Sequence, residues 1–319
     1  MEIKISKKKN NDFSILLVAI YKSKETIKKK IKEYDNFFND MSLWSSRLSV
    51  TTFGVYDNQT LVCHAVVQEG KKAIYIGFVE TVNSKEVVEF LIKNIKDHLN
   101  KRDNINKKIY LPVNQSIWHN YRFKVSGNEL PVFDVNNPSY YSGLFKKYFK
   151  YRHLFETYES NGINYNEPKK FDYNVMEIKI DDLQKEIKKA YEVLISNFGD
   201  EHEPPSYKEF EKSIYEIKNI LNPKLVQFVK YKNKNIGFIS SFVLDNKYYL
   251  KNVSVLSNYR NNKIGKYLYG ITSGNARHMG AKKEYYLFIR IDRLIHRIIK
   301  HKKKTIAKYV LYYSECKHF

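Results

Sequence analysis

The residues best suited to bind a ligand lie in the stretch KNVSVLSNYRNNKIGKYLYGITSGNARHMGA, from Lys251 to Ala281. Alternating apolar residues predict a strand that ends near Val255, and a helical pattern follows after a short polar turn. The first turn of a helix leaves backbone N–H groups without partners, and these attract anions. Gly265 allows close approach to that backbone, and Arg260 and Lys266 add positive charge. We interpret this turn as a candidate anion site, with an ordinary strand-to-helix turn as the alternative.

A second polar cluster interrupts the basic chain in the segment NFGDEHEPPSYKEF, where four consecutive residues are Asp200, Glu201, His202 and Glu203. Carboxylates of this kind can bind a cation or accept a proton. A metal site is not predicted, because no second ligand stands at helical spacing from His202 and both cysteines are remote. The alternative interpretation is a solvated loop that precedes a helix capped by Ser206.

The elements around both clusters follow a mixed α/β order. The pattern predicts a strand, two helices and three strands before the turn, at 173–180, 183–198, 207–221, 225–233, 234–245 and 247–256. After the turn it predicts a helix, a strand, a short basic helix and a final strand, at 266–280, 284–291, 293–303 and 306–316. The second cluster then falls between the first two of these helices.

The first half of the chain shows a similar order of predicted elements. It predicts a helix at 23–41, three strands within 49–80, a helix at 84–102 and a strand at 107–113. The segment 158–172 has Gly162, Pro168 and polar residues without apolar periodicity, which makes it the best boundary candidate. We therefore expect two domains, 1–165 and 166–319, each with a mixed α/β (α+β) sheet.

The composition supports two packed domains with a basic surface. The 319 residues exceed the usual length of one domain, and 43% hydrophobic with 15% aromatic residues suffice for two cores. The formal net charge of +22 attracts polyanions, whether nucleic acid, an acidic membrane or a phosphate-rich cofactor. An AT-rich coding sequence is an equal explanation for much of the lysine excess. Nucleic-acid binding is not favoured, because the basic residues are scattered and no recognition motif appears.

Two cysteines indicate the compartment. Cys63 and Cys316 lie far apart in strand-like apolar runs, which predicts buried free thiols and a reducing cytoplasm. The N-terminal sequence MEIKISKKKNNDF has no apolar core, and no run of about 18 apolar residues occurs, so neither a signal peptide nor a membrane span is predicted. We expect a soluble cytoplasmic protein whose oligomeric state the sequence leaves open.

The element order and the turn together resemble the GNAT acetyltransferase superfamily. Its acetyl-CoA signature, (R/Q)-x-x-G-x-(G/A), is similar to the six residues Arg260, Asn261, Asn262, Lys263, Ile264 and Gly265, followed by Lys266. The resemblance implies that these residues bind the pyrophosphate of acetyl-CoA with the helix dipole behind them. It also implies contacts with the pantetheine arm from Val253, Ser254 and Val255 in the strand, and from Asp292 farther on. The chain departs from the pattern at Lys263, where the first glycine is usual.

The first half is similar to the N-terminal halves of bacterial two-domain GNAT-like proteins, in which a Gly-Pro-x-Asn segment precedes an Asn-Pro-x-Tyr-Tyr helix. Here Leu111 replaces that glycine. The turn that corresponds to the acetyl-CoA signature has no glycine and places Glu80 where phosphate would lie. A carboxylate would repel a pyrophosphate, so we expect this half to lack a CoA site.

The resemblance implies that an amine attacks the thioester of acetyl-CoA. The backbone N–H of Val255 could stabilise the oxyanion. Many relatives place a tyrosine acid after the fifth strand of the fold, but Ile299 stands there in this chain. Nearby in sequence, His296, His301 and Tyr286 are substitutes, and a packed or solvated role is the favoured alternative for each.

In GNAT-like folds, the loop between the first two helices lines the acceptor pocket. The resemblance therefore implies that Asp200, Glu201 and Glu203 bind a cationic amine, and that Glu201, His202 or Glu203 accepts its proton. If they do not, the base is to be sought between Lys251 and Ser254 or in an ordered water.

The sequence thus predicts a bacterial N-acyltransferase that uses acetyl-CoA as co-substrate, with the active site in the second half. We expect a small amine of a metabolite or antibiotic as acceptor, because the N-terminal half would close the groove against a folded protein. The alternative is a non-catalytic GNAT-like module that binds acyl-CoA or a polyanion.

Overall fold

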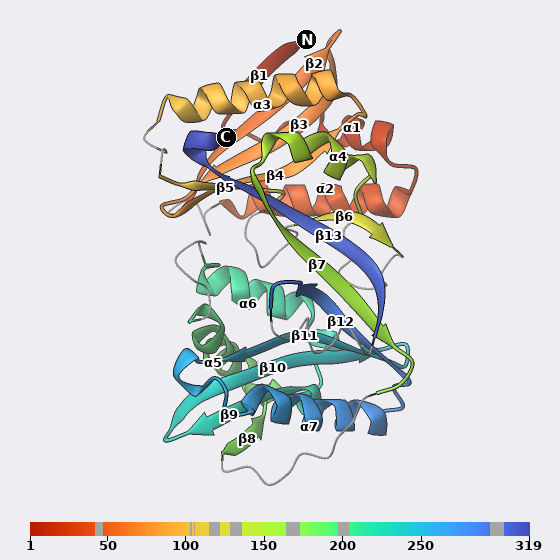
Figure 1. Ribbon diagram of the computed structural model, residues 1–319, viewed down its shortest axis with the longest axis vertical. Coiled ribbons are helices and arrows are strands. Elements are labelled where there is room, and N and C mark those ends of the chain that lie inside the picture. The colour runs from red at the N-terminus through yellow and green to blue at the C-terminus, as the bar shows by residue number, and fades with distance from the viewer. Residues whose placement is uncertain are drawn as a thin grey trace. The chain divides into compact units, whose positions relative to one another are not determined.

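The structure, a computed structural model (Figure 1), describes residues 1–319 except 42–46, 103, 105, 115–121, 128–135, 164–172, 197–203 and 294–302. The chain forms two compact units. The first unit is formed mainly by Met1–Leu154 and Ala307–Phe319, and the second mainly by Phe155–Gly199 and Ser206–Ile306. The chain therefore enters the second unit within one strand, Tyr151–Ser160, and returns to the first within its last strand, Lys304–Glu315.

The first unit is a mixed sheet with helices on both faces (Figure 1). Its helices are α1 (Phe13–Ile20), α2 (Lys24–Asn39), α3 (Lys85–Asn100) and α4 (Tyr140–Phe145). Its strands are β1 (Glu2–Ser6), β2 (Ser49–Asp57), β3 (Thr60–Glu69), β4 (Ala73–Thr81), β5 (Lys108–Leu111), β6 (Phe123–Gly127) and most of β13 (Lys304–Glu315). Strands β1 to β4 are antiparallel in chain order, β5 is parallel to β4, and β13 pairs antiparallel with β5 and β6.

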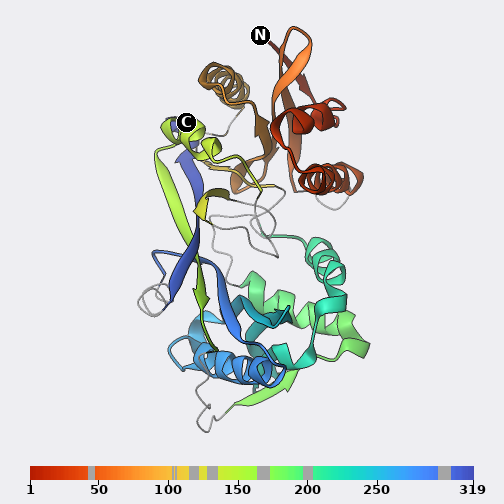
Figure 2. The same ribbon diagram turned by 90° about the vertical axis from the view of Figure 1, so that its right-hand side faces the viewer.

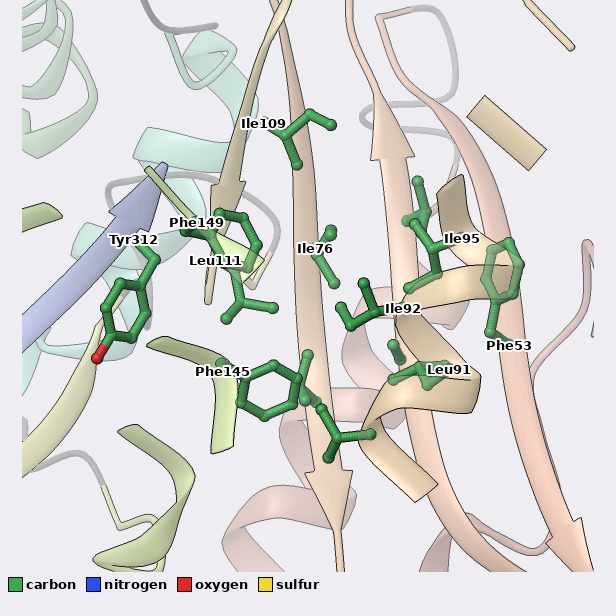
Figure 3. Close-up of a cluster of buried hydrophobic side chains, with 14 of the residues drawn as sticks. Phe53, Ile76, Leu91, Ile92, Ile95, Ile109, Leu111, Phe145, Phe149 and Tyr312 are labelled. Atoms are coloured by element: carbon green, nitrogen blue, oxygen red, sulfur yellow. The ribbon is translucent and has the colours of Figure 1, made fainter. Parts of the chain in front are cut away.

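Alternation along β3 separates the two faces of this sheet. Cys63, Ala65 and Val67 lie in a core cluster with α3, whereas His64 contacts Tyr34 of α2 and Phe13 of α1. The last strand contributes to the same cluster: Figure 3 shows Tyr312 of β13 beside Phe149 and Phe145. The C-terminal residues are thus part of the first unit's core.

The second unit is built on the sheet β7-β12-β11-β10-β9-β8. Its strands are β7 (Tyr151–Ser160), β8 (Asn174–Glu177), β9 (Val226–Tyr231), β10 (Lys234–Leu244), β11 (Lys247–Val255) and β12 (Lys283–Arg290). Its helices are α5 (Leu183–Ile195), α6 (Tyr207–Glu216) and α7 (Ile264–His278). All neighbouring strands are antiparallel except β11 and β12, which are parallel.

Helices cover both faces of this second sheet (Figure 2). On one face, Tyr248 of β11 hydrogen-bonds to Thr272 of α7 at 2.8 Å, and Leu250 shares a core cluster with Leu268 of α7. On the other face, Ser254 Oγ donates to the carbonyl of Val193 in α5 at 3.4 Å. The C-terminal turn of α5 therefore lies beside the end of β11.

These elements confirm the predicted mixed α/β fold. The helix expected at 23–41 is α2, capped by Ser23, and the helix expected at 266–280 begins two residues earlier, at Ile264. The sequence interpretation missed β1, α1, β6 and β7. In β1 the alternation is limited to Ile3 and Ile5, and α1 is only a short apolar run, so neither gave a clear signal. The predicted basic helix at 293–303 lies almost entirely outside the described residues. Among the described parts of the chain, no helix has the length and hydropathy needed to cross a bilayer.

Glu284 of β12 is the centre of a buried polar network in the second unit. Lys303 Nζ lies 3.0 Å from Glu284 Oε2, and their side chains are 4% and 0% exposed. Tyr269 of α7 donates its hydroxyl to Glu284 and also lies 2.7 Å from the hydroxyl of Tyr286. Burial and the Glu284 carboxylate raise the pKa of Tyr269, which keeps its hydroxyl protonated as a donor.

We expect Lys303→Met to lower the free energy of unfolding by about 3–5 kcal/mol, because it leaves the Glu284 carboxylate buried without its cation. Lys283→Met is the matched control. It removes a second ion pair of β12, between Lys283 and Glu159, in which the lysine side chain is 46% exposed. That change should cost no more than about 1 kcal/mol. Urea unfolding of both variants checks the difference, and equal losses would show that the Glu284 pair contributes no more than a surface pair.

Candidate functional site

The turn between β11 and α7 presents backbone N–H groups and positive charge. Asn261 and Lys263 adopt the left-handed conformation, with φ of 72° and 58°, and Lys263 is the N-cap of α7. No side chain caps α7, and its first turn contains no acidic residue. The N–H groups of this first turn have no partner within the helix and can therefore bind an anion.

The side chains of this turn suit a phosphate. Arg260, Lys263 and Lys266 are all exposed, whereas Ile264 is 1% exposed and anchors the start of α7 in the core. Lys263 takes a left-handed conformation, which a glycine would adopt without a Cβ penalty. As the N-cap residue of α7 it brings a positive charge to this end of the helix, while its Cβ imposes some backbone strain.

Strands β11 and β12 diverge in front of this turn. Their parallel register runs from Lys247 and Lys283 to Leu250 and Tyr286, although β11 continues to Val255 and β12 to Arg290. Beyond Tyr286 the two strands form a fork that has no ladder between its arms. Among the described residues, no backbone hydrogen bond closes this fork, so the backbone of the second half of β11 can pair with another extended molecule.

The hydrogen bonds of β11 show which of its groups face the fork. Leu256 N–H donates to the carbonyl of Ile236 at 2.9 Å, so the Gly237–Val255 pair is a non-hydrogen-bonded pair of the antiparallel ladder. In such a ladder the N–H and C=O groups of alternate residues point to the same side. The backbone groups of Val253 and Val255 therefore point away from β10, towards the fork.

The first unit has the same strand order at its corresponding position, but its fork is closed. The β4–β5 register ends at Tyr75 and Tyr110, and Val113 N–H then donates to the carbonyl of Ile76 at 2.9 Å. A Cβ on Gly77 would lie 2.1 Å from the carbonyl oxygen of Val113, so the chain itself fills this space. The adjoining helix α3 is also capped, because Ser84 Oγ accepts the N–H of Val87.

Glu80 lies in a buried network at the end of β4, beside a pocket of the first unit. Its carboxylate accepts from Lys30 Nζ at 2.7 Å and from the hydroxyls of Tyr21 and Tyr141 at 2.8 Å. The pocket is lined by Glu80, Lys30, Tyr141 and Arg122, among others. This pocket lies in the other unit from the turn at Gly265.

The remaining predicted residues are placed as follows. Asp292 is about half exposed after β12, and both of its carboxylate oxygens accept from Arg290, at 2.6 and 2.7 Å. Tyr286 lies in the buried network of Glu284. Several candidates lie outside the described residues: Asp200, Glu201, His202, Glu203, His296, Ile299 and His301.

One family model matches part of the chain. Residues 187–295 match the model of the acetyltransferase (GNAT) family. No curated protein matches the chain.

Solved structures show the same fold over most of the chain. A GCN5-related N-acetyltransferase from Sphaerobacter thermophilus is 12% identical with a TM-score of 0.51, over 89% of this chain and 85% of that one. A probable N-acyltransferase of unknown function from Enterococcus faecalis is 10% identical with a TM-score of 0.57, over 100% and 74% of the two chains. A tandem GNAT protein from the clavulanic acid biosynthesis pathway is 8% identical with a TM-score of 0.52, over 99% of both chains.

Proposed function

On the premise that the chain carries a GNAT acetyltransferase domain within a tandem GNAT fold, we propose that its second half transfers an acetyl group from acetyl-CoA to an amine. The first half then lacks a CoA site of its own. This assignment agrees with the contrast between the two units, one with an open fork and an uncapped helix, the other with a closed fork and a capped helix.

The observation that carries the proposal is the combination of the fork with the N-terminus of α7. The exposed backbone edge at Val253 and Val255 would pair with the amide groups of the pantetheine arm, and the first turn of α7 with Arg260 and Lys266 would bind the pyrophosphate. The N–H of Val255 points to the same side and is a donor for the oxyanion that forms at the thioester carbonyl. Acetyl-CoA supplies the acetyl group, and these residues bind and orient it.

A two-step measurement tests this function. Acetyl-CoA should raise the midpoint of thermal unfolding, and addition of an amine panel should then release free CoA. Thermal stabilisation by acetyl-CoA, without release of free CoA in the presence of any amine, would favour the alternative of a non-catalytic acyl-CoA-binding module. Absence of both effects would remove the proposed site.

We propose a small cationic amine as acceptor, bound by the acidic sequence between α5 and α6. The triple variant Asp200→Asn/Glu201→Gln/Glu203→Gln removes three negative charges. We expect it to raise the KM for the amine several-fold, which corresponds to a loss of about 1–2 kcal/mol of binding free energy. The effect should be strongest at low ionic strength. The KM for acetyl-CoA should stay the same or fall. Steady-state kinetics at two salt concentrations check this, and unchanged kinetics would leave the sequence as a solvated loop.

A further inference from the structure

We propose that the outer face of α1 binds an anionic lipid surface, with Ile15 and Val18 inserted among the headgroups and the neighbouring lysines at the lipid phosphates. This face belongs to the first unit, whereas the turn at Gly265 belongs to the second. The inference therefore goes beyond the proposed transferase function and does not depend on it.

Helix α1 is apolar on its exposed face as well as on its buried face. Phe13, Leu16 and Leu17 are at most 3% exposed, and Leu16 packs in a core cluster of the first unit. Ile15 is 60% and Val18 is 65% exposed, and residues three positions apart are neighbours on a helix surface. The helix sequence, FSILLVAI, contains no charged residue. A surface helix normally carries polar side chains on its outer face, so the exposed pair departs from that pattern.

The neighbouring helices of the first unit follow the usual pattern. In α2 and α3, every residue classed as exposed is polar or charged. In the part of the chain that the structure describes, Ile15 and Val18 are the most exposed large hydrophobic side chains. The packing of the unit does not require them there, which points to a partner for this face.

Exposed lysines flank α1 in the chain. They are Lys7 and Lys8 before the helix and Lys22, Lys24 and Lys28 after it. Lys9 Nζ lies 2.5 Å from Asp35 Oδ1 of α2, so the basic segment before α1 lies against the basic helix that follows it. Residues 4–32 contain ten lysines and two acidic residues, Asp12 and Glu25. The apolar face is therefore set in a positively charged region.

Aliphatic side chains among lysines suit an anionic bilayer. Apolar side chains enter the boundary between headgroups and acyl chains, while lysines attract anionic headgroups. A nucleic acid would gain little from Ile15 and Val18, because bases are bound by aromatic stacking and hydrogen bonds. A symmetric dimer through this face would bring the lysines of both copies together, and like charges repel.

Helix α1 would lie on the bilayer and not across it. Its eight residues are about 12 Å long, which is less than half of the hydrocarbon thickness of about 30 Å. Two aliphatic side chains alone bind weakly, so the lysines supply the second signal. We expect the association to be reversible and to weaken as salt screens the lysines.

The first test is sedimentation of the full chain with phosphatidylcholine vesicles, with and without phosphatidylglycerol. Wild type should bind the anionic vesicles at low salt and bind the neutral ones weakly. Ile15→Ser/Val18→Ser should lower binding to anionic vesicles about tenfold or more, because the inserted apolar surface is lost. Circular dichroism should show unchanged folding, since both side chains are exposed. The matched control is Tyr215→Ser, which removes a 45% exposed side chain from α6 and should leave binding unchanged.

A second pair of variants tests the role of the lysines. Lys22→Gln/Lys24→Gln should lower binding to anionic vesicles about tenfold, with no change on neutral vesicles. Lys232→Gln/Lys234→Gln removes the same charge from two exposed lysines of the second unit and should have a much smaller effect. Equal losses in both variants would show that net charge alone drives binding and would overturn the proposed surface.

Insertion has its own readout. Ile15→Cys, labelled with a polarity-sensitive fluorophore, should shift its emission to shorter wavelength when anionic vesicles are added. The same label at Tyr215→Cys should not shift. Cys63 and Cys316 are buried, so the label reacts with the introduced thiol. Vesicle binding without a shift at residue 15 would contradict insertion of this face.

Other results would assign the face to a different occupant. A dimer in sedimentation velocity that Ile15→Ser/Val18→Ser dissociates, without vesicle binding by wild type, would make the face an interface between copies. An RNA or DNA oligonucleotide that binds wild type, when vesicles do not, would make the lysines a nucleic-acid surface. Either result overturns the proposal, and neither bears on acetyl transfer by the second unit.

Discussion

Fragments 1–165 and 166–319 are expected to be unfolded when each is produced alone, whereas 155–306 is expected to fold. Each fragment cut at residue 165 lacks a strand that its unit needs. The second unit uses Phe155–Ser160 of β7, which pairs with β12 and places Tyr158 at 0% exposure in the core. Thr157 Oγ1 also accepts the N–H of Phe288 at 3.2 Å.

Fragment 1–165 loses more buried surface, because it lacks the C-terminal strand of the first unit. Ala307–Phe319 supplies side chains that are at most 7% exposed, namely Tyr309, Val310, Leu311, Tyr312 and Phe319. Burial of each such side chain contributes about 1.5–3 kcal/mol. Together they match the whole net stability of a domain, about 5–15 kcal/mol. A first unit without this strand should therefore not hold its core.

Circular dichroism and thermal unfolding of the three fragments test this result. Segment 155–306 should unfold cooperatively and gain stability from acetyl-CoA, while 166–319 should show neither property. Cooperative unfolding of 166–319 at the same temperature as 155–306 would contradict the importance of β7. It would also support a domain boundary near residue 165.

Gly265→Val is expected to weaken acetyl-CoA binding by more than about 100-fold, or about 2.7 kcal/mol, while the second unit stays folded. A Cβ at this position would lie 3.3 Å from Val253 Cγ1, so the larger side chain has little room on the strand side. It would instead stand over the first turn of α7, where the N–H groups and the phosphate must meet. Folding should change little, since valine has a better helix propensity than glycine.

Two matched variants make this prediction specific. Gly265→Ala adds only the Cβ and should cause a smaller loss of affinity. Gly143→Val changes a glycine in a helix of the first unit whose Cβ would meet no atom within 4 Å, and it should leave binding unchanged. Calorimetric titration with acetyl-CoA measures all three. Wild-type affinity in Gly265→Val would remove the turn as the phosphate site.

The local parts of this protein could be predicted from its sequence. The helix starts at Ser23 and Ser84 were predicted because an N-cap hydroxyl and an amphipathic pattern lie within a few residues of each other. The strand–turn–helix around Gly265 was predicted from alternating apolar residues followed by a short polar turn and a helical pattern. Element order followed from these local signals, and with it the mixed α/β fold.

Tertiary structure decided the features that depend on distant pairings. Nothing near Tyr312 indicates that its strand pairs with β5 rather than with strands of its own half, since pairing joins residues far apart in the chain. The closed fork of the first unit likewise depends on Val113 reaching Gly77. One such feature, the β-bulge at Lys251, is also visible in the sequence. The spacing between the apolar residues Tyr248, Leu250 and Val253 changes there from two to three. That change marks the bulge only once the partner strand is known, because a register is a property of two strands.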